Sequence, residues 1–399
     1  MDELAGARIA VLNWRDRDHP EAGGAEEYAW RVAEYLQKAG ARVSFVTARA
    51  PGQARRDTVD GVEIVRRGGR WTVYPHALAW LARHRRRIDL VLDCQNGIPF
   101  FAPLAVRRRT PVVLVMHHVH DAQFGVHFPA PVAAFGRWLE GPASRRVYRR
   151  AVTAAVSPST VQAMRSRLGW TGPVYVVPNG LDPVPARGPR AAEPTLVCLG
   201  RLVVHKRVDR LVDAVAELAR RRPGVRLHVV GRGPAEPAVR AAAARAGGAV
   251  TVHGYVDEPA KCRLLGESWL HVSLSDGEGW GIAVVEAASA GLPTVCRDVD
   301  GLRDSVRPHH TGWLIGDNAG VGHPTRTALV DALDRALDEL ADPEVAARMA
   351  AACRAWAARF DWTGTGQRMA DLAAALLRGE RPHPGWSADH ALAEAGPGR

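Results

Sequence analysis

The segment Leu270–Gly291 reads LHVSLSDGEGWGIAVVEAASAG and carries the clearest structural signal in the chain. Its short apolar run Leu270–Leu274 predicts a strand, and the run Ile282–Ala290 before the closing glycine predicts a helix. Three glycines lie in the turn between them. A strand that leads through a glycine-rich turn into a helix is the repeating unit of parallel α/β sheets.

This alternation of short apolar strands and helices recurs along the whole chain. In the first half, we expect strands at Arg8–Leu12, Val43–Thr47, Leu90–Asp93, Val112–Met116, Thr153–Val156 and Val174–Val177. In the second half, we expect them at Leu196–Leu199, Leu227–Val230, Val250–Val252, Leu270–Leu274 and Thr294–Cys296. Short, continuously apolar strands are typical of parallel sheets that are buried on both faces. The predicted fold class is therefore α/β, with two Rossmann-like, doubly wound domains facing across a cleft.

Proline-rich composition marks the join between the two halves, because 182–194 contains four prolines. A helix near the C-terminus is expected to pack back on the first domain, and the Gly- and Pro-rich end of the chain is expected to be a mobile tail. The expected parts are an N-terminal domain, a linker, a C-terminal domain, the returning helix and the tail, over 1–185, 186–194, 195–360, 361–378 and 379–399.

The composition restricts the class of protein. The chain has 399 residues, of which 47% are hydrophobic and 24% charged, which is typical of a globular protein with more than one domain. We expect no membrane-spanning helix, since no apolar run approaches about 20 residues, and no signal peptide. The five cysteines form no close pair, which argues against a disulfide framework and a zinc knuckle. The predicted location is the cytoplasm.

The positive charge is concentrated in the first half. The net charge is +11; residues 1–188 contain 27 basic and 16 acidic residues, and residues 189–399 contain 26 of each. The two halves are therefore expected to face different partners. Only three basic residues are lysines. A lysine within a motif is consequently more informative than an arginine.

Two carboxylates accompany the glycine-rich turn. Glu278 lies in the turn and Glu286 on the following helix. The helix N-terminus, at Gly281 and Ile282, offers backbone N–H groups that favour an anion. A carboxylate beside an anion site is suited to accept hydrogen bonds from sugar hydroxyls, and the later one can bind a ribose diol. The alternative is a plain glycine-rich turn with two exposed glutamates.

Two cations follow the strand at Leu196–Leu199. Arg201 leaves the strand end, and Lys206 stands just before the next helix. Together they can clamp a diphosphate, since arginine offers a planar fork of donors and lysine a point charge. A solvated basic turn is the alternative.

These two segments together resemble the family 4 retaining glycosyltransferases (glycosyl transferases group 1), which have the GT-B fold. The resemblance implies that Arg201 and Lys206 bind the diphosphate of a nucleotide-sugar donor in the second domain. It implies that Glu278 binds the transferred sugar and Glu286 the ribose. The first domain is then the acceptor-binding domain. No cofactor or metal is implied besides the donor, which is a co-substrate.

The resemblance extends to four further turns. Gly231 and Val256 resemble the residues that flank the nucleotide base. Gly23 and Gly24 open a helix after the first strand and resemble the family's glycine-rich loop near the phosphates. A histidine near the transferred sugar is implied just after Val112–Met116. Position favours His117 as a catalytic residue together with Glu278, with the alternatives His118 and His120.

No metal or dinucleotide site is expected. Asp298 and Asp300 have the spacing of metal-binding carboxylates, but a loop beside the donor or acceptor is the preferred interpretation. His309 and His310 lie in a Pro- and Gly-containing turn and are interpreted as a solvated pair. The turn at Gly231 lacks the full dinucleotide fingerprint.

The resemblance thus implies a metal-independent, retaining transfer of a hexosyl unit from a UDP- or GDP-sugar to a hydroxyl of a lipid, glycan or small molecule. The basic first half suits an anionic or lipid-linked acceptor and peripheral contact with the inner face of the membrane. The alternatives are a soluble acidic acceptor and plain composition bias. Gly141–Pro142 is expected to break a helix that carries Phe135 and Trp138. The alternatives are a nucleotide-sugar epimerase and a binder of nucleic acid or anionic surfaces. The basic clusters lack regular aromatic interleaving, so no nucleic-acid partner is expected.

Overall fold

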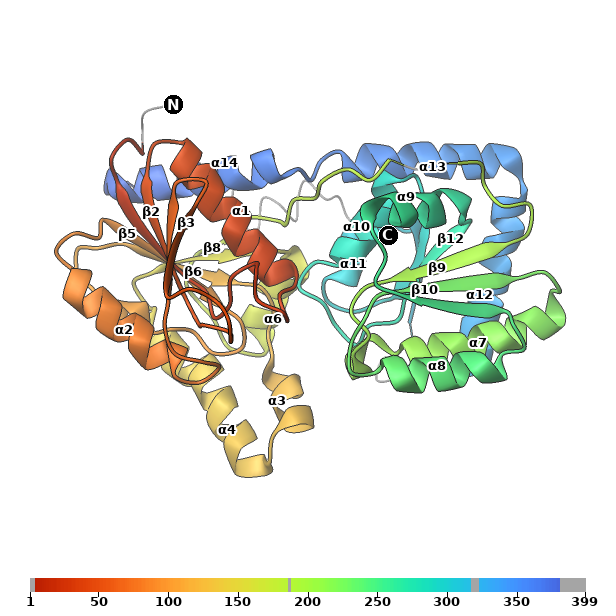
Figure 1. Cartoon of the computed structure of the whole chain (residues 1–399), viewed down its shortest axis with the longest axis horizontal. Coiled ribbons are helices and arrows are strands. Elements are labelled where there is room, and N and C mark those ends of the chain that lie inside the picture. The colour runs from red at the N-terminus through yellow and green to blue at the C-terminus, as the bar shows by residue number, and fades with distance from the viewer. Residues whose placement is uncertain (1–3, 186–187, 317–322, 381–399) are drawn as a thin grey trace. The chain divides into compact units, whose positions relative to one another are not determined.

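The computed structural model describes residues 4–185, 188–316 and 323–380, which form two compact units (Figure 1). Unit 1 comprises the described residues up to 180 together with those from 362 onward, and unit 2 comprises those of 181–361. The chain thus passes between the units at residues 180–181 and again at 361–362. Most of the expected tail, from residue 381, and the first two residues of the expected linker lie outside the described residues.

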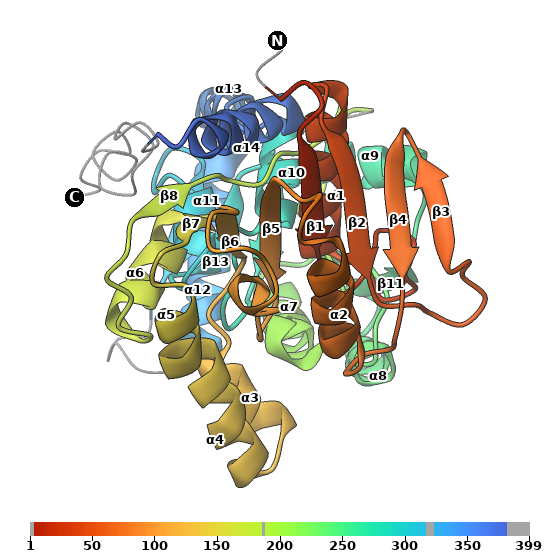
Figure 2. The ribbon, with the colours of Figure 1, turned by 90° about the vertical axis from the view of Figure 1, so that its left-hand side faces the viewer.

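Unit 1 is built on one eight-stranded sheet with the order β3-β4-β2-β1-β5-β6-β7-β8. All neighbouring strands are parallel except β3 and β4, which pair antiparallel at one edge (Figure 2). The strands are β1 (Arg8–Leu12), β2 (Arg42–Thr47), β3 (Arg56–Val59), β4 (Val62–Arg66), β5 (Leu90–Gln95), β6 (Val112–Met116), β7 (Val152–Ala155) and β8 (Val174–Val176).

The apolar runs of the first half form strands as predicted, but the β3–β4 hairpin was not predicted. Its strands are short and rich in charge, so they show no continuous apolar run. Asp60 and Gly61 form the turn with positive φ angles of 51° and 81°. An Asp-Gly pair in this left-handed conformation is a strong hairpin signal that the sequence does contain.

Helices cover both faces of this sheet. They are α1 (Gly24–Lys38), α2 (Val73–His84), α3 (Asp121–His127), α4 (Ala130–Trp138), α5 (Ser144–Val147), α6 (Pro158–Ser166) and α14 (Trp362–Leu377), with a 3-10 turn at Ala102–Leu104. The helix α14 lies against α1, where Tyr35 Oη donates to Gln367 Oε1 at 2.5 Å. Thr365 Oγ1 also donates to the carbonyl of Pro178 at 2.8 Å. These contacts join α14 to the rest of unit 1.

The helices α3 and α4 project from the body of unit 1 (Figures 1 and 2). The expected break at Gly141–Pro142 is wrong, because a π-helical turn at Leu139–Ala143 connects α4 directly to α5. In an α-helix, the proline ring clashes with the carbonyl four residues back, and the wider π-turn gives the ring of Pro142 more room. Phe135 and Trp138 therefore lie on one continuous helical segment.

Unit 2 is built on one six-stranded, fully parallel sheet with the order β11-β10-β9-β12-β13-β14. Its strands are β9 (Thr195–Leu199), β10 (Arg226–Val230), β11 (Val250–Gly254), β12 (Leu270–Ser273), β13 (Thr294–Arg297) and β14 (Gly312–Ile315). Its helices are α7 (Val208–Arg221), α8 (Glu236–Arg245), α9 (Glu258–Glu267), α10 (Ile282–Ser289), α11 (Leu302–Ser305), α12 (Arg326–Ala341) and α13 (Pro343–Ala357), with a 3-10 turn at Val204–Lys206.

Both faces of the second sheet are buried. Alternate residues of β9 enter different cores: Leu196 packs with residues of α7 and α12, whereas Val197 packs with residues of α9 and α10. This period of two is what a strand covered on both faces requires. The predicted α/β class with two Rossmann-like sheets is confirmed. Among the described residues no helix is long and apolar enough to cross a membrane.

Candidate active site

The predicted donor residues of unit 2 gather where its strands end. β9 and β12 are neighbours in the sheet, so the turns that follow them meet at one edge. Lys206, in the turn after β9, donates from Nζ to Oε1 of Glu278, in the glycine-rich turn after β12. The two side chains are only 22% and 18% exposed. The structure thus joins two predicted residues that lie 72 positions apart.

The Lys206 ammonium sets the charge state of Glu278. Burial by itself would raise the pKa of Glu278, but the charge of Lys206 and its hydrogen bond outweigh burial and lower that pKa below 4.5. Glu278 is therefore ionised at neutral pH. Because the folded-state pKa is depressed, the pair contributes stability above pH 4.5, which is lost as the pH falls below that value.

A second ion-pair cluster fixes the start of the same turn. Asp276 accepts from Arg207 at 2.7 Å and from Arg297 at 2.8 Å. Arg207 has a left-handed backbone with φ 52°, which is rare for a residue other than glycine. This strained conformation aims its guanidinium at Asp276. The sequence reasoning missed both arginines, since arginine is abundant and neither stands in a recognised motif.

Arg201 and the start of α10 remain available for a ligand. Arg201 is exposed, and in the described part of the chain its guanidinium has no hydrogen-bond or ion-pair partner. The backbone N–H groups of Gly281 and Ile282 likewise have no acceptor there. An exposed cation and unpaired N–H groups at a helix N-terminus together favour an anion.

The turn after β10 lies against the turn after β9. A Cβ atom at Gly231 would overlap the carbonyl oxygen of Gly200, so only glycine permits this approach. Val256, after β11, packs partly buried on the core that contains Val197 and Val230. Both predicted base-flanking residues therefore lie at the same edge as the predicted diphosphate ligands.

Glu286 is held by a residue that was not predicted. Lys261 Nζ, from α9, lies 3.4 Å from Oε1 of Glu286 on α10. Burial raises the pKa of Glu286, although Lys261 opposes this effect. Lys261 is one of only three lysines in the chain, and this rarity is the signal that could have identified it.

In unit 1, the predicted glycine loop forms the N-terminus of α1. Gly23 precedes the helix and Gly24 is its first residue. The buried carboxylate of Glu26 accepts from the N–H of Gly23 at 2.8 Å and from Nε1 of Trp14 at 2.9 Å. Glu26 thereby fixes the loop after β1, a role that the sequence did not indicate.

The three candidate histidines have different surroundings. His117, directly after β6, is 6% exposed and packs edge-on against Tyr28. Its Nε2 is buried and has no hydrogen-bond partner in the described structure. Burial lowers the pKa of His117 to about 3, with a smaller contribution from His120, so the ring is neutral at pH 7. His120, in contrast, is engaged by the carbonyl of His118 at 2.9 Å and by Glu140.

The described residues contain no group of three or more metal-ligating side chains. Asp298 and Asp300, the candidate metal ligands, both pair with Arg303, at 2.8 and 3.8 Å. The carbonyl of Asp300 accepts from the N–H of Glu278 at 3.0 Å, so this loop supports the glycine-rich turn.

Comparison with known proteins identifies the family of the chain. The model of the glycosyl transferases group 1 matches residues 193–339, and that of glycosyltransferase family 4 matches residues 22–184. A GDP-mannose-dependent alpha-(1-6)-phosphatidylinositol monomannoside mannosyltransferase of Mycobacterium tuberculosis is 32% identical over 90% of this chain and 96% of its own length.

Two more distant proteins cover nearly the whole chain. GDP-mannose:cellobiosyl-diphosphopolyprenol alpha-mannosyltransferase of Komagataeibacter xylinus is 27% identical over 91% of this chain and 92% of its own. The solved structure of sucrose-phosphate synthase from Thermosynechococcus elongatus superimposes with a TM-score of 0.77 at 21% identity, covering 94% of this chain and 100% of that one. The chain is therefore a glycosyltransferase of family 4, within the glycosyl transferases group 1, and has the GT-B fold.

Proposed function

We propose that this glycosyltransferase moves a hexosyl unit, with retention at the anomeric carbon and without a metal ion, from a GDP-linked donor to an acceptor hydroxyl. The observation that carries the proposal is the Lys206–Glu278 pair, which lies at the same sheet edge as the start of α10 and as Arg201, a side chain without a partner among the described residues. The cations and the helix N-terminus suit a diphosphate, and the carboxylate suits sugar hydroxyls.

The proposed chemistry uses these groups in the transition state. Arg201, Lys206 and the N–H groups at Gly281 and Ile282 stabilise the charge that develops on the departing diphosphate. Glu278 orients the hydroxyls of the sugar, and Glu286 binds the ribose. The acceptor hydroxyl approaches on the face that the diphosphate leaves, and its proton passes to a diphosphate oxygen.

GDP is proposed as the nucleotide because both mannosyltransferase relatives are named for GDP-mannose. Mannose is accordingly the first hexose to test. Gly231 and Val256 are the proposed neighbours of the base. Gly23 and Gly24 are the residues of unit 1 that we assign to the diphosphate.

We assign His117 to the sugar rather than to proton transfer. Its ring is neutral at pH 7, and its buried Nε2 lacks a partner among the described residues, so that this nitrogen is free to make a hydrogen bond. Such a bond would strengthen as positive charge develops on the sugar ring. His118 and His120 are the alternatives in the sequence, but the contacts of His120 with Glu140 and with the carbonyl of His118 occupy it.

We further propose a cytoplasmic location with peripheral contact at an anionic membrane. All five cysteines are free, which fits a reducing compartment. On α4, Phe135 and Trp138 are 59% and 52% exposed and stack on one another. Exposed aromatic rings on a projecting helix, near basic residues, are suited to a lipid interface.

The epimerase alternative is not favoured, because both nearly full-length enzyme relatives described above are named as transferases. Binding of nucleic acid is not favoured either, since the chain belongs to an enzyme family and has a suitable residue at each motif position named above.

Nucleotide binding tests the donor site directly. GDP at 100 times its dissociation constant should stabilise the protein by about 2.7 kcal/mol in the presence of EDTA, measured by thermal unfolding. Arg201→Ala should remove most of this shift. The control Arg226→Ala deletes the same charge at the opposite end of the sheet, at the start of β10, and should leave the shift unchanged. A shift that requires metal, or that follows UDP instead of GDP, would contradict the proposal.

Glu278→Gln should lower kcat on the order of 100-fold, because a neutral amide loses a charged hydrogen bond worth about 1.5–3 kcal/mol. The matched control is Glu217→Gln, since Glu217 pairs only with Arg221 on α7 in the described contacts. Steady-state turnover with GDP-mannose gives the readout, and an unchanged unfolding midpoint shows that the fold is intact. Near-normal turnover of the glutamine variant would remove Glu278 from the site.

The pH profile tests the state of His117. Because burial depresses its pKa to about 3, the neutral ring persists throughout pH 5–8, and kcat/KM should show no inflection from this residue there. His117→Gln should lower kcat/KM at every pH without changing the shape of the profile. The control His310→Gln, at an exposed turn position, should leave both the height and the shape of the profile unchanged. An inflection near pH 6.5 that disappears only in His117→Gln would contradict the assignment.

Vesicle sedimentation tests the membrane contact. The double variant Phe135→Ala/Trp138→Ala should reduce binding to phosphatidylglycerol vesicles at least about fivefold, because burial of each ring contributes on the order of 1 kcal/mol or more. Leu104→Ala is the control, since Leu104 is 70% exposed but lies outside α4. Equal binding by the double variant and the wild type would exclude α4 as the contact.

A further inference from the structure

A strongly basic cavity opens at the carboxyl edge of the sheet in unit 1. Its volume is about 530 Å³, and it follows the ends of β2 and β4. The polar side chains that line it are Arg49, Arg55, Arg66, Arg67 and His76. No carboxylate is among the described residues that line it.

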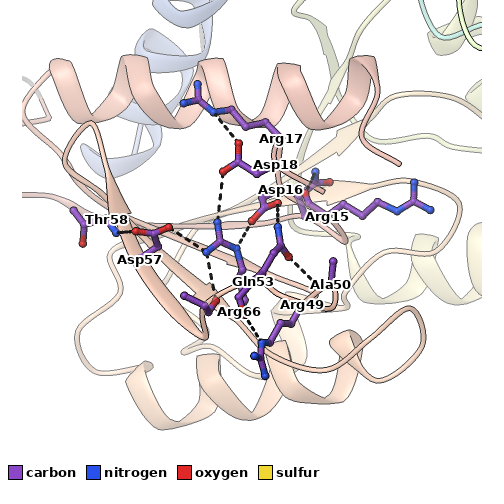
Figure 3. A network of polar contacts seen from close by, with 12 residues as sticks. Arg15, Asp16, Arg17, Asp18, Arg49, Ala50, Gln53, Asp57, Thr58 and Arg66 are labelled. Carbon is purple, nitrogen blue, oxygen red and sulfur yellow. Dashed lines mark hydrogen bonds and ion pairs between the residues drawn. The ribbon is translucent and has the colours of Figure 1, made fainter. Parts of the chain in front are cut away.

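Arg66, which lines this cavity, is held by a network of polar contacts (Figure 3). The side chains of Arg66 and Asp16 are 3% and 1% exposed, and Nε of Arg66 donates to Oδ2 of Asp16. Asp57 and Asp18 lie 3.4 and 3.7 Å from the same guanidinium. Three carboxylates thus contact the Arg66 guanidinium and hold it in place, and Asp18 also pairs with Arg17 at 3.8 Å.

The other arginines of the cavity keep their charge available. Arg49 donates from Nε to the carbonyl of Gln53 at 2.7 Å, which leaves its two terminal nitrogens for a ligand. Gln53 also donates to Asp16 at 3.1 Å, so that it links Arg49 to the buried pair. The exposed side chains of Arg55 and Arg67 have no hydrogen-bond or ion-pair partner in the described part of the chain. Arg49, Arg55 and Arg67 therefore line one cavity with guanidinium nitrogens that have unused hydrogen-bond donors, and such groups favour a bidentate anion such as phosphate.

The cavity lies at the edge of the sheet where we place the acceptor. It lies at the same edge of the sheet as Gly23, Gly24 and His117, because all three follow parallel strands of that sheet. Strands β2 and β6 are three places apart in the sheet order, or about 14 Å at the usual strand spacing. A phosphate in the cavity could therefore belong to the molecule whose hydroxyl reacts near His117.

We propose that this cavity binds a phosphate group of the acceptor, so that the acceptor is a phosphorylated polyol or sugar, either free or as a lipid headgroup. This inference rests on the proposed transfer reaction. A second basic cavity, of about 440 Å³ and lined by Arg107–Arg109, Arg146, Arg149 and Arg150, lies where β6 and β7 begin. That is the opposite edge of the sheet, which makes its arginines matched controls of equal charge.

The test measures the binding of glucose 6-phosphate to the full chain by calorimetric titration, with glucose as the uncharged counterpart. Wild type should bind the phosphate ester and not glucose. Arg55→Ala/Arg67→Ala should weaken binding at least about tenfold, as expected when two charged hydrogen bonds are lost. Arg108→Ala/Arg109→Ala should change it less than about twofold, since it removes the same charge at the remote edge.

Three outcomes would overturn the inference: no binding of glucose 6-phosphate, equal binding of glucose, or equal losses in the two double variants. The last would mean that net charge, rather than the cavity, attracts the anion. Unfolding midpoints of the variants exclude a folding defect. Arg66 is not substituted, because its removal would leave three carboxylates without the cation that they share.

Two further measurements show whether the phosphate belongs to a lipid or to a soluble acceptor, and whether the donor proposal fails independently of the phosphate cavity. In the first, sedimentation with phosphatidylglycerol vesicles is compared for wild type and Arg55→Ala/Arg67→Ala. Loss of vesicle binding by the variant assigns the phosphate to a lipid headgroup, and unchanged binding assigns it to a soluble acceptor. Stabilisation by GDP without binding of glucose 6-phosphate overturns the phosphate cavity and leaves the donor site standing. Binding of glucose 6-phosphate without stabilisation by GDP overturns the donor site and leaves the phosphate cavity standing.

Discussion

The ion pair between Lys206 and Glu278 depends on a constraint of sheet topology. β9 and β12 are adjacent and parallel, so their carboxyl ends lie at one edge and the turns after them meet. Once these turns meet, a lysine and a glutamate that are remote in sequence share a half-buried site. The other residues that we propose for the donor site depend on the same geometry, because Gly231 and Gly281 also follow strands that end at this edge.

In both units, ion pairs hold carboxylates and arginines in place, and a nearby arginine is left available for an anionic ligand. Asp276 is held by Arg207 and Arg297 in unit 2, while Arg201 is left unpaired in the part of the chain that the structure describes. In unit 1, three carboxylates surround Arg66, and the neighbouring Arg55 stays exposed. A buried ion pair contributes little net stability by itself, but it fixes the position of the groups around it. A site that must receive an anion benefits from this arrangement, since its cations need no rearrangement on binding.

The sequence could predict most strands and the glycine-rich turn before α10 because both depend on local pattern. Short apolar runs identified the parallel strands, and the glycines between two such runs identified the turn and the helix after it. The β3–β4 hairpin escaped because its strands are charged, and the helical segment through Pro142 was wrongly broken because a π-turn accommodates the proline. Lys261, Glu26 and Arg297 escaped because their roles come from partners on other elements.

The sequence by itself determined the fold class, the glycine-rich turns and the residue types available at the strand ends. Hydrophobic periodicity and backbone freedom are properties of short segments, and they can be read without knowing the neighbours. Only the tertiary structure decided which polar groups are paired: Lys206 with Glu278, and Arg66 with Asp16. It also buries His117 with a nitrogen that has no partner among the residues the structure describes. Pairing and burial depend on which strands lie side by side, and the physical reason is that electrostatic energies are set by distance and solvent exposure rather than by sequence order.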